Sequence, residues 1–428
     1  MYTHGFWDKE LAPMRKEYLI GILRVTALIT ILIWGIVTIY WGSLSGEYEH
    51  TPNISAYVVN RDPTGAIGQN VTGALLSTNK GPIPHLTWTE IDAARYPTRA
   101  SIEQAVAVDF DTWIIVEVLA NATAALESAR NAGQASWDPT QVVTVAYAEA
   151  RNQIAIDGPI LGSVRGVLTP VLARISAASA ASWLAANSGN AAAITRAATQ
   201  APQTIAPAVG MTMLNTRPFD QPLALAPTFV GLIYLMILAF NITMGNFGMR
   251  QGLARKLKLS SYIVMRLIVP LVAYVWLSLM FSMINLPFKL DFAKMGEGNA
   301  AGFFAFYGFS LVGMAVLGLT TEAFLALVGP PFIGFALLFF IIINVSVANL
   351  PIELQNRFYQ LGYALPFYNL RQAYLTIVFN VGQHSTLLKY WGILMAWLVV
   401  LLLTIPIWVW LERRREQAAA KNGPPQQH

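Results

Sequence analysis

The sequence has 428 residues, of which 55% are hydrophobic and only 12% are charged. Soluble globular proteins carry about 25% charged residues, and charged side chains are costly in hydrocarbon, so we predict an integral membrane protein. The chain contains no cysteine, which excludes thiolate nucleophiles, zinc–thiolate sites, iron–sulfur clusters and disulfides. The net charge is +5 without a basic tract interleaved with aromatics, so nucleic acid is not an expected partner.

Six segments are long and apolar enough to cross a bilayer. The first, residues 19–41, follows a cytosolic N-terminal segment, residues 1–18, and lacks a small-residue cleavage site. These features favour an uncleaved signal anchor over a removable signal peptide. A large domain, residues 42–222, separates it from the other spans. These further spans are residues 223–245, 261–285, 301–327, 331–348 and 390–411.

The predicted fold class is therefore an α-helical polytopic membrane protein of six transmembrane helices, with a mixed α/β external domain between helices 1 and 2. Lysine and arginine gather before the first span, after the second span and in a basic tail at 412–428. The positive-inside rule then puts both termini in the cytosol and residues 42–222 in the extracellular space or lumen. Three sequons in that domain predict N-glycosylation, at Asn53, Asn70 and Asn121.

Local patterns predict mixed secondary structure in the external domain. Residues 54–60 and 112–118 are rich in β-branched and aromatic side chains, which is typical of strands. From about residue 121 the chain is alanine-rich, which favours helices. Asp138, followed by proline, predicts the N-cap of a helix that runs through Arg151.

Residues 223–411 form the predicted five-helix membrane domain, and one part of it is unlike a simple span. Residues 349–389 are too polar to cross the bilayer, too apolar for a free loop, and rich in aromatics. Pro351 and Pro366 interrupt any helix there. We predict an interfacial segment of short helices that either lie at the outer leaflet or dip into it.

Two strings carry a resemblance to a known family. They are Arg217-Pro218-Phe219 through Val230-Gly231-Leu232-Ile233-Tyr234-Leu235, and Gly362-Tyr363-Ala364-Leu365-Pro366 with Tyr368-Asn369. With these strings and its layout, the chain resembles the fungal nitrosoguanidine-resistance proteins, in which one span, a large external domain and five further spans follow in this order. That family is similar in turn to the membrane domains of ABC-2-type exporters and to bacterial phage-infection proteins.

The resemblance implies a permease-like protein of the plasma membrane or endomembranes that is connected with tolerance of toxic small molecules and with lipid organisation. It brings no catalytic residues with it. The chain has no phosphate-binding G-x-x-x-x-G-K-[ST], no G-x-S-x-G and no H-E-x-x-H, and its five histidines are scattered. We therefore expect neither an ATPase nor another enzyme, and no cofactor or metal.

Three ionisable residues inside the predicted spans are candidate site residues. Glu322, Arg266 and Arg24 each lie about five residues from the cytosolic end of a span, or about 8 Å deep. Glu322 can therefore pair with either arginine. Such an intramembrane charge cluster would line a cytosolic vestibule or couple proton movement to transport. Alternatively, the arginines snorkel to the interface and Glu322 is a structural partner.

The predicted architecture and the resemblance are compatible with two functions. The first is a permease-like protein that exports hydrophobic compounds or moves lipid between leaflets. The second is a non-transporting regulator of lipid organisation or of a partner transporter. The expected partners are membrane lipids, with a hydrophobic small molecule, an oligomer and a partner membrane protein as further candidates.

Overall fold

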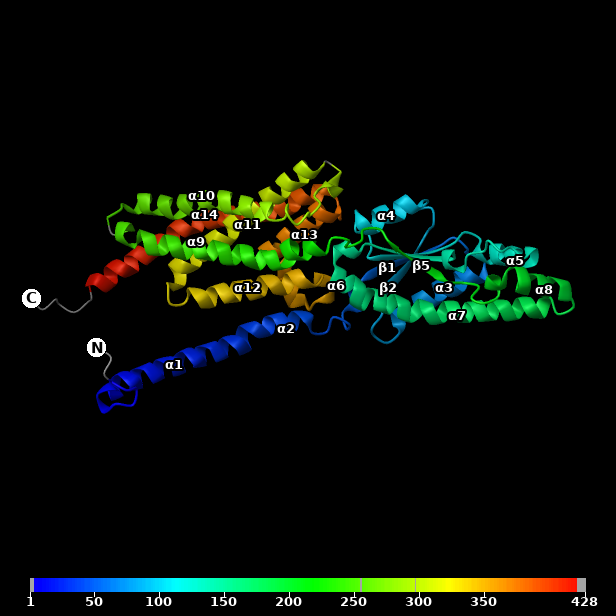
Figure 1. Cartoon of the computed structure of the whole chain (residues 1–428), viewed down its shortest axis with the longest axis horizontal. Helices are drawn as coiled ribbons and strands as arrows, with labels where there is room; N and C mark the ends of the chain where they lie inside the picture. Colours follow the sequence, from blue (N-terminus) through cyan, green and yellow to red (C-terminus); the bar gives the residue numbers. More distant parts are fainter. Residues whose placement is uncertain (1–3, 255, 297, 422–428) are drawn as a thin grey trace, which may run out of the picture.

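The structure, a computed structural model, describes residues 4–254, 256–296 and 298–421, with side chains of the last helix to residue 418. The chain forms an α/β domain and a helical bundle that lie end to end (Figure 1). The first described helix begins, and the last one ends, at the bundle end far from the α/β domain. Residues 1–3 and 422–428 of the predicted terminal segments lie outside the described residues.

The α/β domain is built on a five-stranded sheet with the strand order β2-β1-β3-β4-β5. Neighbouring strands are parallel except for the antiparallel pair β3 and β4. The predicted strands at 54–60 and 112–118 are confirmed as β1 and β3. The strands are β1 Ser55–Asn60, β2 Thr87–Ile91, β3 Ile114–Val118, β4 Val143–Tyr147 and β5 Met211–Asn215.

The predicted helix from Asp138 to Arg151 is wrong. Asp138 does act as a cap, because its carboxylate accepts a hydrogen bond from the backbone N–H of Thr140 at 2.9 Å. It opens only a short 3₁₀ turn, after which the chain enters β4. The alternating valines of β4 fit a buried strand, and β4 pairs on both sides, with β3 and with β5. Pairing with β3 and β5, rather than the local cap, therefore makes this segment a strand.

Helices cover both faces of the sheet. One face packs against α3, α5 and α7 and holds Val58 and Val116 in its core, while the other packs against α4 around Val59 and Ile115. A short helix and a π turn lead into α7, and α8 packs on α5. The helices are α3 Ala66–Ser77, α4 Arg99–Ala107, α5 Ala122–Ala132, α6 Gln153–Ala155, α7 Leu161–Ala186 and α8 Ala191–Gln200.

The bundle comprises the remaining long helices. Helix α11 lies at its centre, with 72% of its most apolar stretch buried, against 6% for the first helix of the chain. It contacts α9, α10, α12, α13 and α14. These helices are α9 Gly231–Ala254, α10 Leu259–Met283, α11 Asn299–Val328, α12 Ile333–Asn349, α13 Pro366–Phe379 and α14 His384–Lys421.

The first helix joins the bundle at one end only. It runs through α1 (Ala12–Leu32), a π turn and α2 (Thr38–Leu44). The α2 part packs against α12, whereas α1 lies apart from the bundle in Figure 1. Its apolar side chains, such as Leu23, Ile31 and Trp34, are exposed. In a membrane protein such a surface is covered by lipid.

Six described helices are long and apolar enough to cross a membrane. Five of them contain predicted spans to within two residues at the ends of the spans, and the sixth is Gln153–Ala186, which belongs to the α/β domain and packs against its sheet. The remaining predicted span, 331–348, coincides with α12, whose 17 residues reach about 26 Å. The chain is thus mostly helical, with a small sheet.

Residues 350–379 dip into the bundle and return. The indole N–H of Trp397 donates to the carbonyl of Ala364 at 2.7 Å, and Trp397 lies about 20 Å along α14 from His384. The following helix, α13, has 12 of its 14 residues buried. Just beyond it, the N–H of Gly382 bonds the carbonyl of Ala107 in the α/β domain at 2.8 Å. Residues 350–379, which we call the dipping segment, are thus packed into the bundle, and their place relative to the outer leaflet stays a prediction.

The contact between the two parts is polar and buried. The Arg151 guanidinium lies over the rings of Trp113 and Phe110, at 3.9 and 4.2 Å from their centroids, and burial lowers its pKa. The neighbouring Asn152 donates from its amide to the carbonyl of Asn349, at the end of α12, at 3.0 Å. The Asn152–Asn349 bond joins the α/β domain to the bundle, and the stacking of Arg151 lies within the α/β domain beside it.

Close packing between α10 and α11 gives a first prediction. A Cβ atom at Gly318 would overlap the hydroxyl of Tyr274, which is fully buried. We expect Gly318→Ala to destabilise the protein by about 1–3 kcal/mol and to lower its thermal unfolding temperature in detergent. The control is Gly308→Ala in the same helix, where the nearest atom to the new Cβ is 3.6 Å away. Equal unfolding temperatures for the two variants would contradict the packing.

Candidate functional site

Four charged side chains meet inside the bundle at the end far from the α/β domain. Arg250 comes from the last turns of α9, Arg266 from the second turn of α10, Glu322 from the end of α11 and Glu412 from α14. Helices α9 and α11 run away from the α/β domain, so residues near their ends lie at the far end of the bundle (Figure 1). Helix α10 runs back toward the domain, so a residue near its start lies at that same end. We call these four residues the charge cluster.

Glu322 is the centre of the charge cluster. Its Oε1 atom accepts a hydrogen bond from Nε of Arg266 and lies 2.8 Å from Nη2 of Arg250. A second nitrogen of Arg266, Nη1, pairs with Glu412. Side-chain exposure is 0–1% for Arg250, Arg266 and Glu322, and 19% for Glu412. Two cations thus face two carboxylates, which is the arrangement that makes buried charge tolerable.

The structure brings two of the three predicted site residues together. Glu322 and Arg266 form an ion pair, and the Arg266 side chain is fully buried in the bundle. Arg24 is not part of the charge cluster: it is exposed on α1, which lies apart from the bundle (Figure 1). Equal depth in the membrane did not imply contact, because α1 leans on the bundle only through α2.

Sequence reasoning missed Arg250 and Glu412. Both lie beyond the predicted spans, which end at residues 245 and 411, whereas α9 continues to Ala254 and α14 to Lys421. For Glu412 the available signal was the absence of glycine and proline from residue 412 to residue 421, whereas Gly248 and Gly252 obscured the continuation of α9 to Arg250. Because α9 and α14 continue beyond their apolar stretches, they place Arg250 and Glu412 in the interior of the bundle.

An aromatic ring and a third arginine complete the surroundings. The guanidinium carbons of Arg413, Arg266 and Arg250 lie 4.5, 5.4 and 5.8 Å from the ring centroid of Tyr262. Arg413 also donates to the carbonyls of Leu257 and Ala254, at 3.0 and 2.6 Å. Cation–π attraction and these bonds tie α14 to the turn between α9 and α10.

The charge cluster also holds unused hydrogen-bonding groups. Among the described residues, Nε and Nη1 of Arg250 and Oε2 of Glu322 have no hydrogen-bond partner. The arrangement can therefore hold four helix ends together and can also bind a polar group among them. Across the described part of the chain, no cluster of three or more histidine, aspartate or glutamate side chains could hold a metal.

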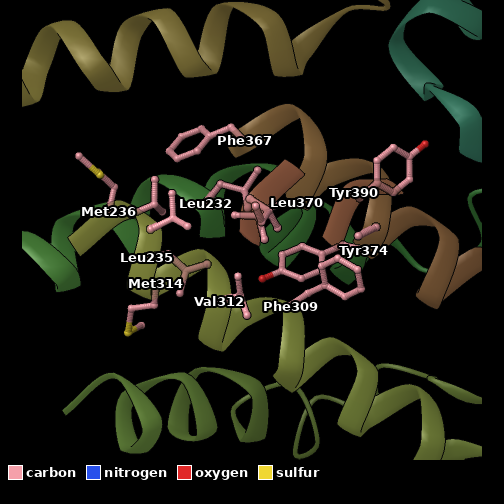
Figure 2. Packing of buried hydrophobic residues seen from close by; sticks show 14 of the residues in the cluster. Leu232, Leu235, Met236, Phe309, Val312, Met314, Phe367, Leu370, Tyr374 and Tyr390 are labelled. Atoms are coloured by element: carbon pink, nitrogen blue, oxygen red, sulfur yellow. The ribbon is translucent and has the colours of Figure 1, made fainter. Parts of the chain in front are cut away.

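The two strings that carry the family resemblance meet at α13. Figure 2 shows Leu232 and Leu235 of α9 near Phe367 and Leu370 of α13, with Val312 of α11 beside them. A Cβ at Gly313 would lie 2.7 Å from Leu370, and one at Gly362 would lie 2.6 Å from Val347. Side chains of the two strings therefore pack against one another where residues 350–379 enter the bundle.

The three predicted glycosylation sites lie in the α/β domain. Asn53, Asn70 and Asn121 are all exposed. The Asn53 amide donates to the carbonyl of Glu353 at 3.0 Å, and the Asn70 amide to that of Ala66 at 2.6 Å. Asn121 adopts a left-handed conformation (φ 50°) just before α5.

Removing one carboxylate tests the charge cluster. Glu322→Gln leaves Arg250 and Arg266 with Glu412 alone, so we expect a loss of about 3–5 kcal/mol of stability, seen as a lower unfolding temperature in detergent. Adding Arg250→Met restores the balance and should recover part of the loss. Arg24→Gln is the exposed control. A Glu322→Gln variant as stable as the wild type, or no recovery in the double variant, would contradict this role.

Comparison with known proteins places the chain in a family. A family model described as a protein of unknown function, DUF3533, matches residues 25–403. An uncharacterized endoplasmic reticulum membrane protein of Saccharomyces cerevisiae is 23% identical over 424 residues, covering 92% of this chain and 80% of that protein. No solved structure matches. The family match spans the α/β domain and most of the bundle, and this multi-pass membrane protein belongs to the DUF3533 family.

Proposed function

We propose that the protein is a permease-like transporter that exports hydrophobic compounds or moves lipid between leaflets, that it is not an ATPase or other enzyme, and that it thereby confers tolerance of toxic small molecules. The observation that carries this proposal is the dipping segment, residues 350–379, inside the bundle. Non-helical backbone at membrane depth is tolerated where it is buried in protein or lines a cavity, and discontinuous helices form the binding sites of many transporters.

Polar groups hold the turn of the dipping segment. The amide of Asn369 donates to the carbonyls of Tyr363 and Leu365, at 3.0 and 2.8 Å, and the side-chain oxygen of Asn344 accepts from the N–H of Phe367 at 3.1 Å. Asn369 and Asn344 are both fully buried. The bonds to Tyr363 and Phe367 satisfy backbone groups that have no helical partner, and a substrate that competes for them would have a route to shift the turn.

The charge cluster supplies the second element of the proposal. It ties α9, α10, α11 and α14 together at the end away from the α/β domain. Separating its ion pairs would open that end, and a polar group could then enter among the unpartnered atoms of Arg250 and Glu322.

Orientation and location belong to the same proposal. We place the α/β domain outside the cytosol and both termini in the cytosol, which agrees with the common position of the first and last helix ends in Figure 1. The yeast relative is named as an endoplasmic reticulum membrane protein, which supports the endomembrane system, with the plasma membrane as the alternative.

Glycosylation tests the orientation. We expect glycosidase treatment to increase the gel mobility of protein expressed in a eukaryotic cell, and single Asn→Gln changes at Asn53, Asn70 or Asn121 to remove one step each where the site is used. The matched measurement is protease protection in sealed microsomes. Digestion of the α/β domain from the cytosolic side, with a protected C-terminal tag, would reverse the orientation.

Transport can be measured with the purified chain in liposomes. We expect it to scramble labelled lipid or release a hydrophobic dye, with and without a pH gradient. Gly362→Val should reduce the rate at least 10-fold, because a Cβ there lies 2.6 Å from Val347 at the dipping turn. The control is Gly392→Val, where a Cβ has nothing within 4 Å. Failure of both assays with folded wild-type protein would remove the transport proposal.

A regulator is the second candidate function. It is favoured by the hydrogen bonds between the α/β domain and the end of α13: Nε of Arg217 to the carbonyl of Asn380 at 3.1 Å, and the amide of Gln383 to Asp109 at 2.8 Å. A partner bound to the domain would thereby act on the membrane segment. This function predicts no flux in liposomes, but a loss of resistance in cells when only the domain is altered.

A further inference from the structure

A cleft of about 690 Å³ lies in the α/β domain between α3, α5 and α7. The charge cluster and the dipping segment lie elsewhere, in the bundle, so the proposed transport does not use this cleft. Its size is within the range of small-molecule sites. Its polar lining includes Arg130, Arg174, Glu127 and Asn131.

Arg130 is a buried cation without a carboxylate partner. Its side chain is 1% exposed, and no ion pair involves it among the described residues. Its Nε donates to the carbonyl of Thr204 at 2.8 Å, and its Nη1 to the hydroxyl of Ser179 at 2.8 Å. Within the described structure, Nη2 has no partner. Burying an unpaired charge is unfavourable, and an anion in the cleft would compensate it.

The charges around Arg130 set the valence of that anion. Arg174 is exposed on α7 and adds a second positive charge to the cleft lining. Glu127, one turn before Arg130 on α5, adds one negative charge and acts electrostatically on Arg130. Burial lowers the pKa of Arg130, which reflects how little solvent reaches it. Arg130, Arg174 and Glu127 together carry one net positive charge, so a ligand with a single negative charge would neutralise the cleft.

Apart from Arg174, the α7 side of the lining combines four apolar residues with the hydroxyls of Ser179 and Ser182. Ile175 and Trp183 are nearly buried there, and Ala178 and Ala186 lie on the same helix. The indole N–H of Trp183 donates to the side-chain oxygen of Asn131 at 3.0 Å, which fixes the ring against α5. An anionic head at Arg130 would therefore leave an apolar tail room along Ile175 and Trp183.

We propose that this cleft is a binding site for an amphipathic monoanion, in which Nη2 of Arg130 donates to a carboxylate, sulfate or phosphate head and the apolar body lies against α7. Free acids and single-chain lipids share this chemistry. The site would give the α/β domain a ligand of its own, whether or not the bundle transports anything.

Binding of paired probes tests the site. We would measure octanoate, octyl sulfate and neutral octanol by equilibrium dialysis against the full chain in detergent, before and after deglycosylation because Asn70 lines the cleft. Partition into micelles is common to all samples, so the difference between variants reports the site. We expect at least one of the two anions to bind in a 1:1 ratio, and octanol to bind at least 10-fold more weakly. The tighter of the two anions identifies the head group.

Three variants separate charge, space and fold. Arg130→Gln should weaken anion binding at least 10-fold, and Ala178→Phe should do the same by filling the cleft while Arg130 is retained. Arg165→Gln is the control, because Arg165 is an exposed arginine of α7 outside the cleft. Unfolding temperatures report folding for each variant, and Ala178→Phe decides if Arg130→Gln does not fold. Wild-type affinity in the folded Ala178→Phe variant, or octanol binding equal to both anions, would overturn the proposal.

Discussion

Arg266 is fully buried in the bundle, and a guanidinium does not lose its proton in a protein. Its charge must be met where it lies, and two carboxylates do so: Glu322 from the central helix and Glu412 from the last one. Because the two carboxylates carry two negative charges, they also compensate the charge of a second buried cation, Arg250. This one requirement explains why α9 and α14 continue past their apolar stretches, because only the longer helices carry Arg250 and Glu412 into reach.

Much of the membrane architecture could be predicted from the sequence, because lipid imposes length and apolarity on each span. Five of the predicted spans lie in long apolar helices. The same measure does not tell lipid from a protein interior: α7 passes it while packing on the sheet, and α12 is shorter than the rest. In the α/β domain, β1 and β3 were predictable from local composition. The strand β4 was not, since an apparent cap at Asp138 suggested a helix and only pairing with β3 and β5 makes the segment extended.

The sequence predicted which residues lie at the same level along the helices, but it did not predict which helices are neighbours. Counting residues from the span ends placed Glu322, Arg266 and Arg24 at one level, and two of them do meet. Which helices are neighbours depends on side-chain packing across the bundle, so Arg24 on the outlying α1 could not be excluded. The two prolines of residues 349–389 predicted a broken helix. That it dips depends on space beside Gly313 and Gly362, far apart in the sequence.

Helix α13 has a mechanical consequence. It is a single unbroken element about 21 Å long, anchored at one end by Asn344 and Trp397 within the bundle and followed at the other by a bond to Ala107 of the sheet domain. Beyond Phe379 the chain leaves the helix at Asn380 (φ 54°), so α13 is coupled to α4 through a short bend and the Gly382–Ala107 bond. A shift of the inner turn of α13 would therefore also alter a contact with the α/β domain.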